Sequence, residues 1–285
     1  MMRSIPAVLL ILFVFWDATN GFLIQSSNKL FSSQAPRGLH LKRQTSPRFQ
    51  RLVTQAKLGA IIFACDGVLV DSERDGHRVA LNAALKEVRP DLECSVEEYG
   101  RLLQVRGEEK LSRLWDEMGW DGMNMDLAIQ IYNRKSEIFT KMLEDKKLPI
   151  RPGVLSLVDE AIAAGIPLAV CSSNTQKNVE LIIESMGPQR AKHFSIFAGG
   201  RVVHRKPSPD IYNLCKGSLS LHSEDVVIIE DDLVGLQAAK AAHCACLITK
   251  STYSVNDDFK TADLVVDDLK SVGTVRLEPC WTLND

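Results

Sequence analysis

Three apolar stretches of this sequence each end in polar side chains that could bind a phosphate and a metal ion. These side chains are Asp66 after the first stretch, Ser172, Ser173 and Asn174 after the second, and Glu230 and Asp231 after the third. Lys206 stands between the second and third stretches. Carboxylates are ligands that Mg²⁺ prefers, and hydroxyl and ammonium groups neutralise the oxygens of a phosphoryl group. The residue types therefore predict magnesium-dependent phosphoryl transfer.

Most roles in such a site can be assigned. Ser172 and Lys206 would hold the non-bridging phosphate oxygens, with Ser173 and Asn174 as further substrate contacts. The cation would lie among Asp66, Glu230 and Asp231. Asp66 could also protonate the leaving oxygen and later activate water, which makes Asp66 and Lys206 the candidate catalytic residues. No residue of this set is a nucleophile.

The elements that must position these residues follow from the hydrophobic pattern. After residue 57, short apolar runs alternate with helical stretches, which is typical of an α/β fold with a parallel sheet covered by helices. The ligand site of such a sheet lies beyond the carboxyl ends of its strands. Helices are predicted around 154–162 and 179–186. The apolar runs are Leu58–Cys65, Ile166–Cys171, Val226–Ile229, Cys244–Ile248 and Leu264–Val266.

Residues 75–148 contain no strand-like run and interrupt the alternation after the first strand. Ser95 and Glu98 fit a capping box that opens a helix through Leu103, and the apolar spacing from Leu127 to Met142 predicts a longer helix. We therefore expect an all-helical domain over 75–148, hereafter the cap. The α/β core would comprise 58–74 and 149–285.

The four polar elements, in this order, resemble the motifs of the haloacid dehalogenase superfamily, over nearly all of the chain from Leu58 to Leu269. This resemblance implies a Rossmannoid parallel sheet with an inserted helical cap that closes over the substrate. The first motif of the family reads Asp-x-Asp-Gly, and its first Asp attacks phosphorus. Asp66 and Gly67 fix the register here, so Ala64 occupies the position of the nucleophile.

Finer features resemble the CbbY-like sugar-phosphate phosphatases. The matching stretches are Asp71–Arg78, Ile196–Gly200, Glu230–Ala242 and Leu247–Tyr253. The resemblance implies a sugar-phosphate substrate of the xylulose 1,5-bisphosphate class, although β-phosphoglucomutases have the same architecture. It also implies substrate contacts from Glu73 and His77. The alternative for His77 is a structural or solvated side chain, and Asp71 and Ser72 could simply end the strand and cap the next helix.

Ala64 is the main departure from the family pattern. A methyl group cannot accept a phosphoryl group, and Cys65 should point to the opposite side of the strand as a packed thiol. The change also removes one metal ligand, which Asp232 could replace if it is not simply a solvated acid. Either residue 64 is mis-sequenced and the protein is an active phosphatase or phosphomutase, or the protein binds a sugar phosphate or a protein partner without catalysis.

Two further departures fall outside the core motifs. The cap stretch Val105–Lys110 matches the family's glycine-rich loop only at Gly107, and Arg106 or Lys110 would have to reach the substrate. Altered cap residues favour the non-catalytic interpretation, because an error at residue 64 would not change them. His243 ends a predicted helix where relatives have Gly, which should affect stability rather than chemistry.

The N-terminal segment has the composition of a targeting sequence. Met1–Gly21 resembles a secretory signal, and Phe22–Lys57 contains no acidic residue, as in transit peptides. In series they resemble bipartite plastid leaders; the alternative is the secretory pathway. Residues 1–57 carry a net charge of +7 and, since the whole chain carries −2, the rest carries −9. The acidic body argues against a nucleic-acid partner, and no membrane association is expected after removal of the leader.

The seven cysteines are scattered and lie mostly inside apolar runs. Their odd number and lack of paired spacing predict reduced core residues rather than disulfides or a zinc site.

Overall fold

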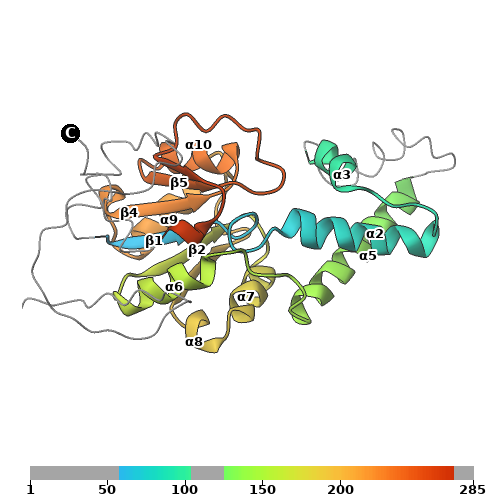
Figure 1. Ribbon diagram of the computed structural model, residues 1–285, viewed down its shortest axis with the longest axis horizontal. Helices are drawn as coiled ribbons and strands as arrows, with labels where there is room; N and C mark the ends of the chain where they lie inside the picture. The colour runs from blue at the N-terminus through green and yellow to red at the C-terminus, as the bar shows by residue number, and fades with distance from the viewer. Residues whose placement is uncertain (1–57, 104–124, 273–285) are drawn as a thin grey trace, which may run out of the picture. The chain divides into compact units, whose positions relative to one another are not determined.

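The structure, a computed structural model, describes residues 58–103 and 125–272. These residues contain a six-stranded parallel sheet of order β3-β2-β1-β4-β5-β6, and Figure 1 shows its central strands. Every pair of neighbouring strands in it is parallel. The sheet confirms the predicted α/β class. Its strands are β1 (Ala60–Phe63), β2 (Leu168–Ser172), β3 (Phe194–Ala198), β4 (Val226–Glu230), β5 (Ala245–Thr249) and β6 (Leu264–Val266).

The central strands are apolar up to their last residues because helices cover both faces of the sheet. In β1, Ile61 and Phe63 pack into the core on one face, whereas Ala60 and Ile62 pack into the core on the other. Side chains of α6 (Val154–Ala163) and α7 (Gln176–Ser185) fill the first core. Those of α9 (Asp210–Ser218) and α10 (Leu233–Ala241) fill the second.

The remaining short elements of the core are α8 (Pro188–Ala191), η2 (Ser223–Asp225) and η3 (Leu269–Ser271). The predicted helices at 154–162 and 179–186 correspond to α6 and α7. Gly165 ends the α6 segment with φ +68°, the left-handed conformation expected of a terminating glycine.

β3 is not among the strands predicted from the sequence. Its residues Phe194, Ser195 and Ile196 are only half-buried, because β3 lies at the edge of the sheet and pairs with β2 alone. An edge strand with one polar side chain has neither the continuous apolar run of a central strand nor a long alternation. β3 is held as a strand by its pairing with β2, which begins at Leu168 and Phe194, and not by a pattern in its own residues.

The described part of the cap is helical and contains no strand. Its elements are the π-helical turn η1 (Glu73–His77), α2 (Arg78–Val88), α3 (Val96–Leu102) and α5 (Met125–Glu144). The predicted capping box is present, since Ser95 and Glu98 exchange hydrogen bonds at the start of α3. These helices have their own small core, built around Leu85, Leu102 and Ile131.

Val70 and Ile150 form an antiparallel bridge where the chain leaves the core for the cap and returns. Within 58–103 and 125–272, no helix is long and apolar enough to cross a membrane. Six cysteines are described and all six are buried, as expected of core residues.

His243 adopts φ +59° directly after α10, the left-handed conformation that favours glycine. We predict that His243→Gly is more stable than His243→Ala by about 1 kcal/mol, because both lose the imidazole but only Gly relieves the backbone. Urea unfolding of the two variants measures the difference. Equal stabilities would contradict the prediction.

Candidate active site

Asp66 lies at the centre of a hydrogen-bonded group at the carboxyl edge of the sheet. Ser72 Oγ donates to Asp66 Oδ1 at 2.7 Å, and Ser172 Oγ lies 3.4 Å from Oδ2. Asn174 Nδ2 lies 3.3 Å from Oδ1. The structure thus brings together Asp66, Ser172 and Asn174. Ser72 makes no side-chain cap on η1, so the capping interpretation of this serine is wrong.

Lys206 forms an ion pair with the buried carboxylate of Glu230. The Nζ–Oε1 distance is 2.7 Å, and Nζ also donates to the carbonyl of Cys171 at 3.2 Å. Tyr212 donates its hydroxyl to the same Glu230 oxygen. Burial by itself would lower the pKa of Lys206, but the charge of Glu230 outweighs it and the pKa is raised. Lys206 therefore stays positively charged beside Ser172.

Three consecutive carboxylates at the end of β4 form an oxygen-only group. Glu230, Asp231 and Asp232 each offer an oxygen within 4.8 Å of the others. Burial, followed by the charges of Asp232 and Glu230, raises the pKa of Asp231 well above its usual value. A hard cation would relieve this repulsion, so the donor set fits Mg²⁺. The carboxylate of Asp66 is not part of this group, because it faces Ser72, Ser172 and Asn174.

Asp232 also caps α10, since its Oδ1 accepts a hydrogen bond from the backbone N–H of Gly235 at 2.6 Å. Asp232 is therefore not a freely solvated acid, and its role as a compensating metal ligand stays a prediction.

Two glycines allow the carboxylates to approach the backbone. A Cβ on Gly67, whose φ is +75°, would lie 1.9 Å from Asp231 Oδ2. A Cβ on Gly235 would lie 2.2 Å from the carboxyl carbon of Glu230. No side chain fits at either position without moving an acid of the site.

Ala64 follows β1 with a side chain that is only 3% exposed, and its N–H donates to the carbonyl of Ile229 at 2.8 Å. Cys65 belongs to the hydrophobic core, as predicted, and burial raises the pKa of its thiol well above the usual value. A protonated, buried thiol is a poor nucleophile. Neither residue can therefore replace an attacking carboxylate.

The site opens into a cavity of about 480 Å³ between core and cap residues. Asp66 and Asp231 line it from the core. Glu73 of η1, together with Gly100 and Leu103, lines it from the cap side. A smaller hollow of about 180 Å³ lies beside Ser172, Ser173 and Lys206, together with the Gly199–Gly200 turn.

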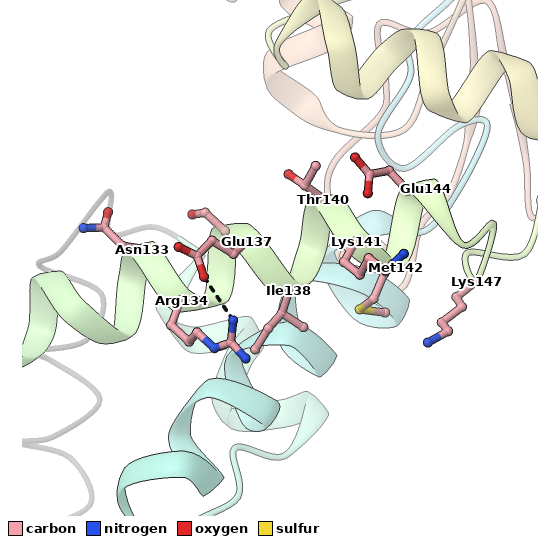
Figure 2. A pocket seen from close by; sticks show the side chains of 10 residues that line it. Asn133, Arg134, Glu137, Ile138, Thr140, Lys141, Met142, Glu144 and Lys147 are labelled. Atoms are coloured by element: carbon pink, nitrogen blue, oxygen red, sulfur yellow. Dashed lines mark hydrogen bonds and ion pairs between the residues drawn. The ribbon is translucent and has the colours of Figure 1, made fainter.

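A third hollow, of about 880 Å³, runs along α5 (Figure 2). Its lining comes from α5 and Lys147, and Arg134 pairs there with Glu137. None of the strand-end residues lines it, so it lacks the chemistry of the other two.

The remaining predicted residues are placed as follows. Glu73 lines the 480 Å³ cavity and accepts a hydrogen bond from the hydroxyl of Tyr99 at 2.7 Å. The ring of His77 stacks on Phe139, with centroids 3.8 Å apart, which is a packing contact within the cap. Arg106 and Lys110 lie outside the described residues.

Tyr212 is not among the predicted site residues, because an aromatic residue on a helix is typical of a core position. Its hydroxyl contact with Glu230 arises only when α9 packs on one face of the sheet. Thr252 was also not identified as a partner of Asp71, to which it donates from both its hydroxyl and its backbone N–H. The matched stretch Leu247–Tyr253 was the only signal for it.

The family model for haloacid dehalogenase-like hydrolases matches residues 61–249, a span that contains Asp66, Ser172, Lys206 and Asp231. The chain belongs to the haloacid dehalogenase-like hydrolases. A CBBY-like protein of Arabidopsis thaliana is 40% identical over 217 residues, which are 73% of this chain and 68% of that protein.

Two solved structures of CbbY-like hydrolases are similar to this chain. CbbY from Rhodobacter sphaeroides in complex with phosphate has a TM-score of 0.64 and 34% identity, over 76% of this chain and 96% of that one. A mutant of the same protein in complex with xylulose 1,5-bisphosphate has a TM-score of 0.65 and 33% identity, over 78% and 100%. Both the predicted family and its CbbY-like branch are confirmed.

For this member of the hydrolase family we predict that Gly67→Ala lowers stability by more than Gly165→Ala and also weakens magnesium binding. The two glycines have similar φ values, +75° and +68°, but nothing lies within 4 Å of a Cβ on Gly165. Gly165→Ala should therefore cost about 1 kcal/mol for the backbone alone. Urea unfolding and Mg²⁺ titration calorimetry measure both effects. Equal Mg²⁺ affinities in the two variants would contradict the prediction.

Proposed function

We propose that this hydrolase-family chain binds a sugar phosphate of the CbbY substrate class but has lost the covalent step of phosphate transfer. The observation that carries the proposal is the buried methyl group of Ala64 at the end of β1, where the family's attacking carboxylate belongs. The neighbouring thiol of Cys65 stays protonated and packed in the core.

The phosphate-binding groups support retention of binding. The charged ammonium of Lys206 and the hydroxyl of Ser172 lie beside the same small hollow. Replacing an acid by Ala64 also removes negative charge that would repel a bound phosphate. Asp66, hydrogen-bonded by Ser72, keeps its proposed place as the acid and base group.

Magnesium would be held by Asp231, with Glu230, Asp66 and Asp232 as the nearby acids. When bound, it would neutralise charge on the phosphoryl oxygens. The lost carboxylate at residue 64 removes one anionic ligand, so we expect weaker magnesium binding than in a site with Asp there.

A second candidate function is an active magnesium-dependent sugar-phosphate phosphatase or phosphomutase, with residue 64 misread. The completeness of the rest of the site favours it, since the Lys206–Glu230 pair and the Asp66 contacts are all present. For either candidate we propose a plastid location, supported by the acid-free segment Phe22–Lys57; the secretory pathway is the alternative.

We predict that Ala64→Asp releases phosphate from xylulose 1,5-bisphosphate faster than the parent by about a million-fold, or roughly 8 kcal/mol of barrier, by analogy with other lost nucleophiles. Ala64→Asn is the matched control, because it has the same shape without a nucleophilic oxygen anion. Phosphate release is measured with and without MgCl₂.

Robust magnesium-dependent turnover by the parent would overturn the non-catalytic proposal and favour the second candidate. If Ala64→Asp is also inactive, the defect extends beyond residue 64, as divergence of the cap would produce.

We predict separately that Ser172→Ala weakens binding of xylulose 1,5-bisphosphate to the parent by about tenfold, since a hydrogen bond to a charged group contributes about 1.5–3 kcal/mol. Ser185→Ala is the control, because its hydroxyl donates to the Ile182 carbonyl within α7. Titration calorimetry gives both affinities. Unchanged affinity in Ser172→Ala would remove this hydroxyl from the proposed phosphate site.

A further inference from the structure

Arg151 lies where the chain re-enters the core after the cap. Its backbone N–H donates to the carbonyl of Leu69 at 2.8 Å, and the preceding Ile150 bridges to Val70. The segment that returns from the cap at Ile150 and Arg151 is therefore hydrogen-bonded to the segment that leads into the cap at Leu69 and Val70. These two segments form the hinge between core and cap.

The guanidinium of Arg151 extends from this hinge to the loops at the carboxyl edge of the sheet. Nη1 donates to the carbonyl of Gly67 and lies 3.2 Å from that of Thr249. Nη2 donates to the carbonyl of Lys250 and lies 3.4 Å from that of Asp267. Gly67 follows β1, Thr249 and Lys250 lie at the end of β5, and Asp267 follows β6. The planar, five-donor fork of arginine can join three such loops, which a lysine ammonium cannot do equally well.

The Gly67 contact connects Arg151 to the acidic group of the site. Gly67 packs so closely against Asp231 that a Cβ would lie 1.9 Å from Oδ2. The place of the Gly67 backbone therefore decides how much room the Asp231 carboxylate has. Burial lowers the pKa of Arg151, and the charges of Asp231 and then Asp71 act against that lowering, so both acids lie near the guanidinium.

We propose that Arg151 is a positioning residue that holds the Gly67 turn against Asp231 and so sets the geometry of the cation-binding carboxylates. Because Arg151 lies in the segment that returns from the cap, it also connects that segment to this site. The inference rests on the proposed cation site and goes beyond it by assigning a residue that none of the strand-end motifs contains.

The test separates positioning from general stabilisation. Mg²⁺ alone is titrated into the full 285-residue chain, into Arg151→Ala and into Arg151→Lys, at a temperature where circular dichroism shows each to be folded. Gly165→Ala serves as the control, because it destabilises the core through its φ of +68° without a contact near the site. Urea unfolding gives the stability of every variant.

Arg151→Ala should bind Mg²⁺ about tenfold or more weakly, the size typical of residues that orient metal ligands, while Gly165→Ala stays within twofold of the parent. Arg151→Lys should show most of the same loss, because it keeps the charge but not the fork. If Arg151→Ala does not fold, Arg151→Lys alone decides.

Two results would overturn the inference. Magnesium affinities of the folded Arg151 variants within twofold of the parent would make Arg151 a structural crosslink only, with the proposed cation site intact. If the parent itself does not bind Mg²⁺ at millimolar concentrations, the cation site and the inference fail together.

Discussion

Closely spaced negative charge at the carboxyl edge of the sheet is the constraint on which this site depends. Glu230 is buried, Asp66, Asp231 and Asp232 lie near it, and a carboxylate removed from water without a partner is costly. Each acid is stabilised differently. Asp66 accepts from hydroxyl and amide donors, Glu230 pairs with Lys206, and Asp232 caps a helix.

Asp231 is the least compensated of the four. Its pKa is raised by burial and by both neighbouring acids, and a hydrogen bond from Ser251 acts only partly against them. A fifth acid at residue 64 would add to the same repulsion and would require the cation more strongly. Under the proposed function, Ala64 lowers this repulsion and also leaves the site without the attacking carboxylate. Loss of the covalent step and retention of phosphate binding are therefore compatible in that proposal.

Much of the fold could be predicted because its signals are local. The apolar runs of β1, β2, β4 and β5 are continuous, and the capping box at Ser95 is a four-residue pattern. The edge strand β3 was missed because its stability comes from pairing with β2 rather than from its own composition. The Asp66–Ser172 contact could be anticipated from strand ends that meet at one edge. The Tyr212–Glu230 and Arg151–Gly67 contacts could not be anticipated. A tyrosine on a helix is typical of any core position, and an arginine in a loop is typical of any solvated surface.

The sequence by itself determined the chemical inventory of this protein: the acids, the lysine, the hydroxyls, their order, and the methyl group at residue 64. It did so because strand ends and motif spacing are local properties of the chain. Only the tertiary structure decided how that inventory is used. In the folded chain Lys206 pairs with Glu230, Ser72 donates a hydrogen bond to Asp66, and the ring of His77 packs on that of Phe139. Partner choice among buried polar groups depends on which side chains packing brings within hydrogen-bond distance, and that is settled by contacts far apart in the sequence.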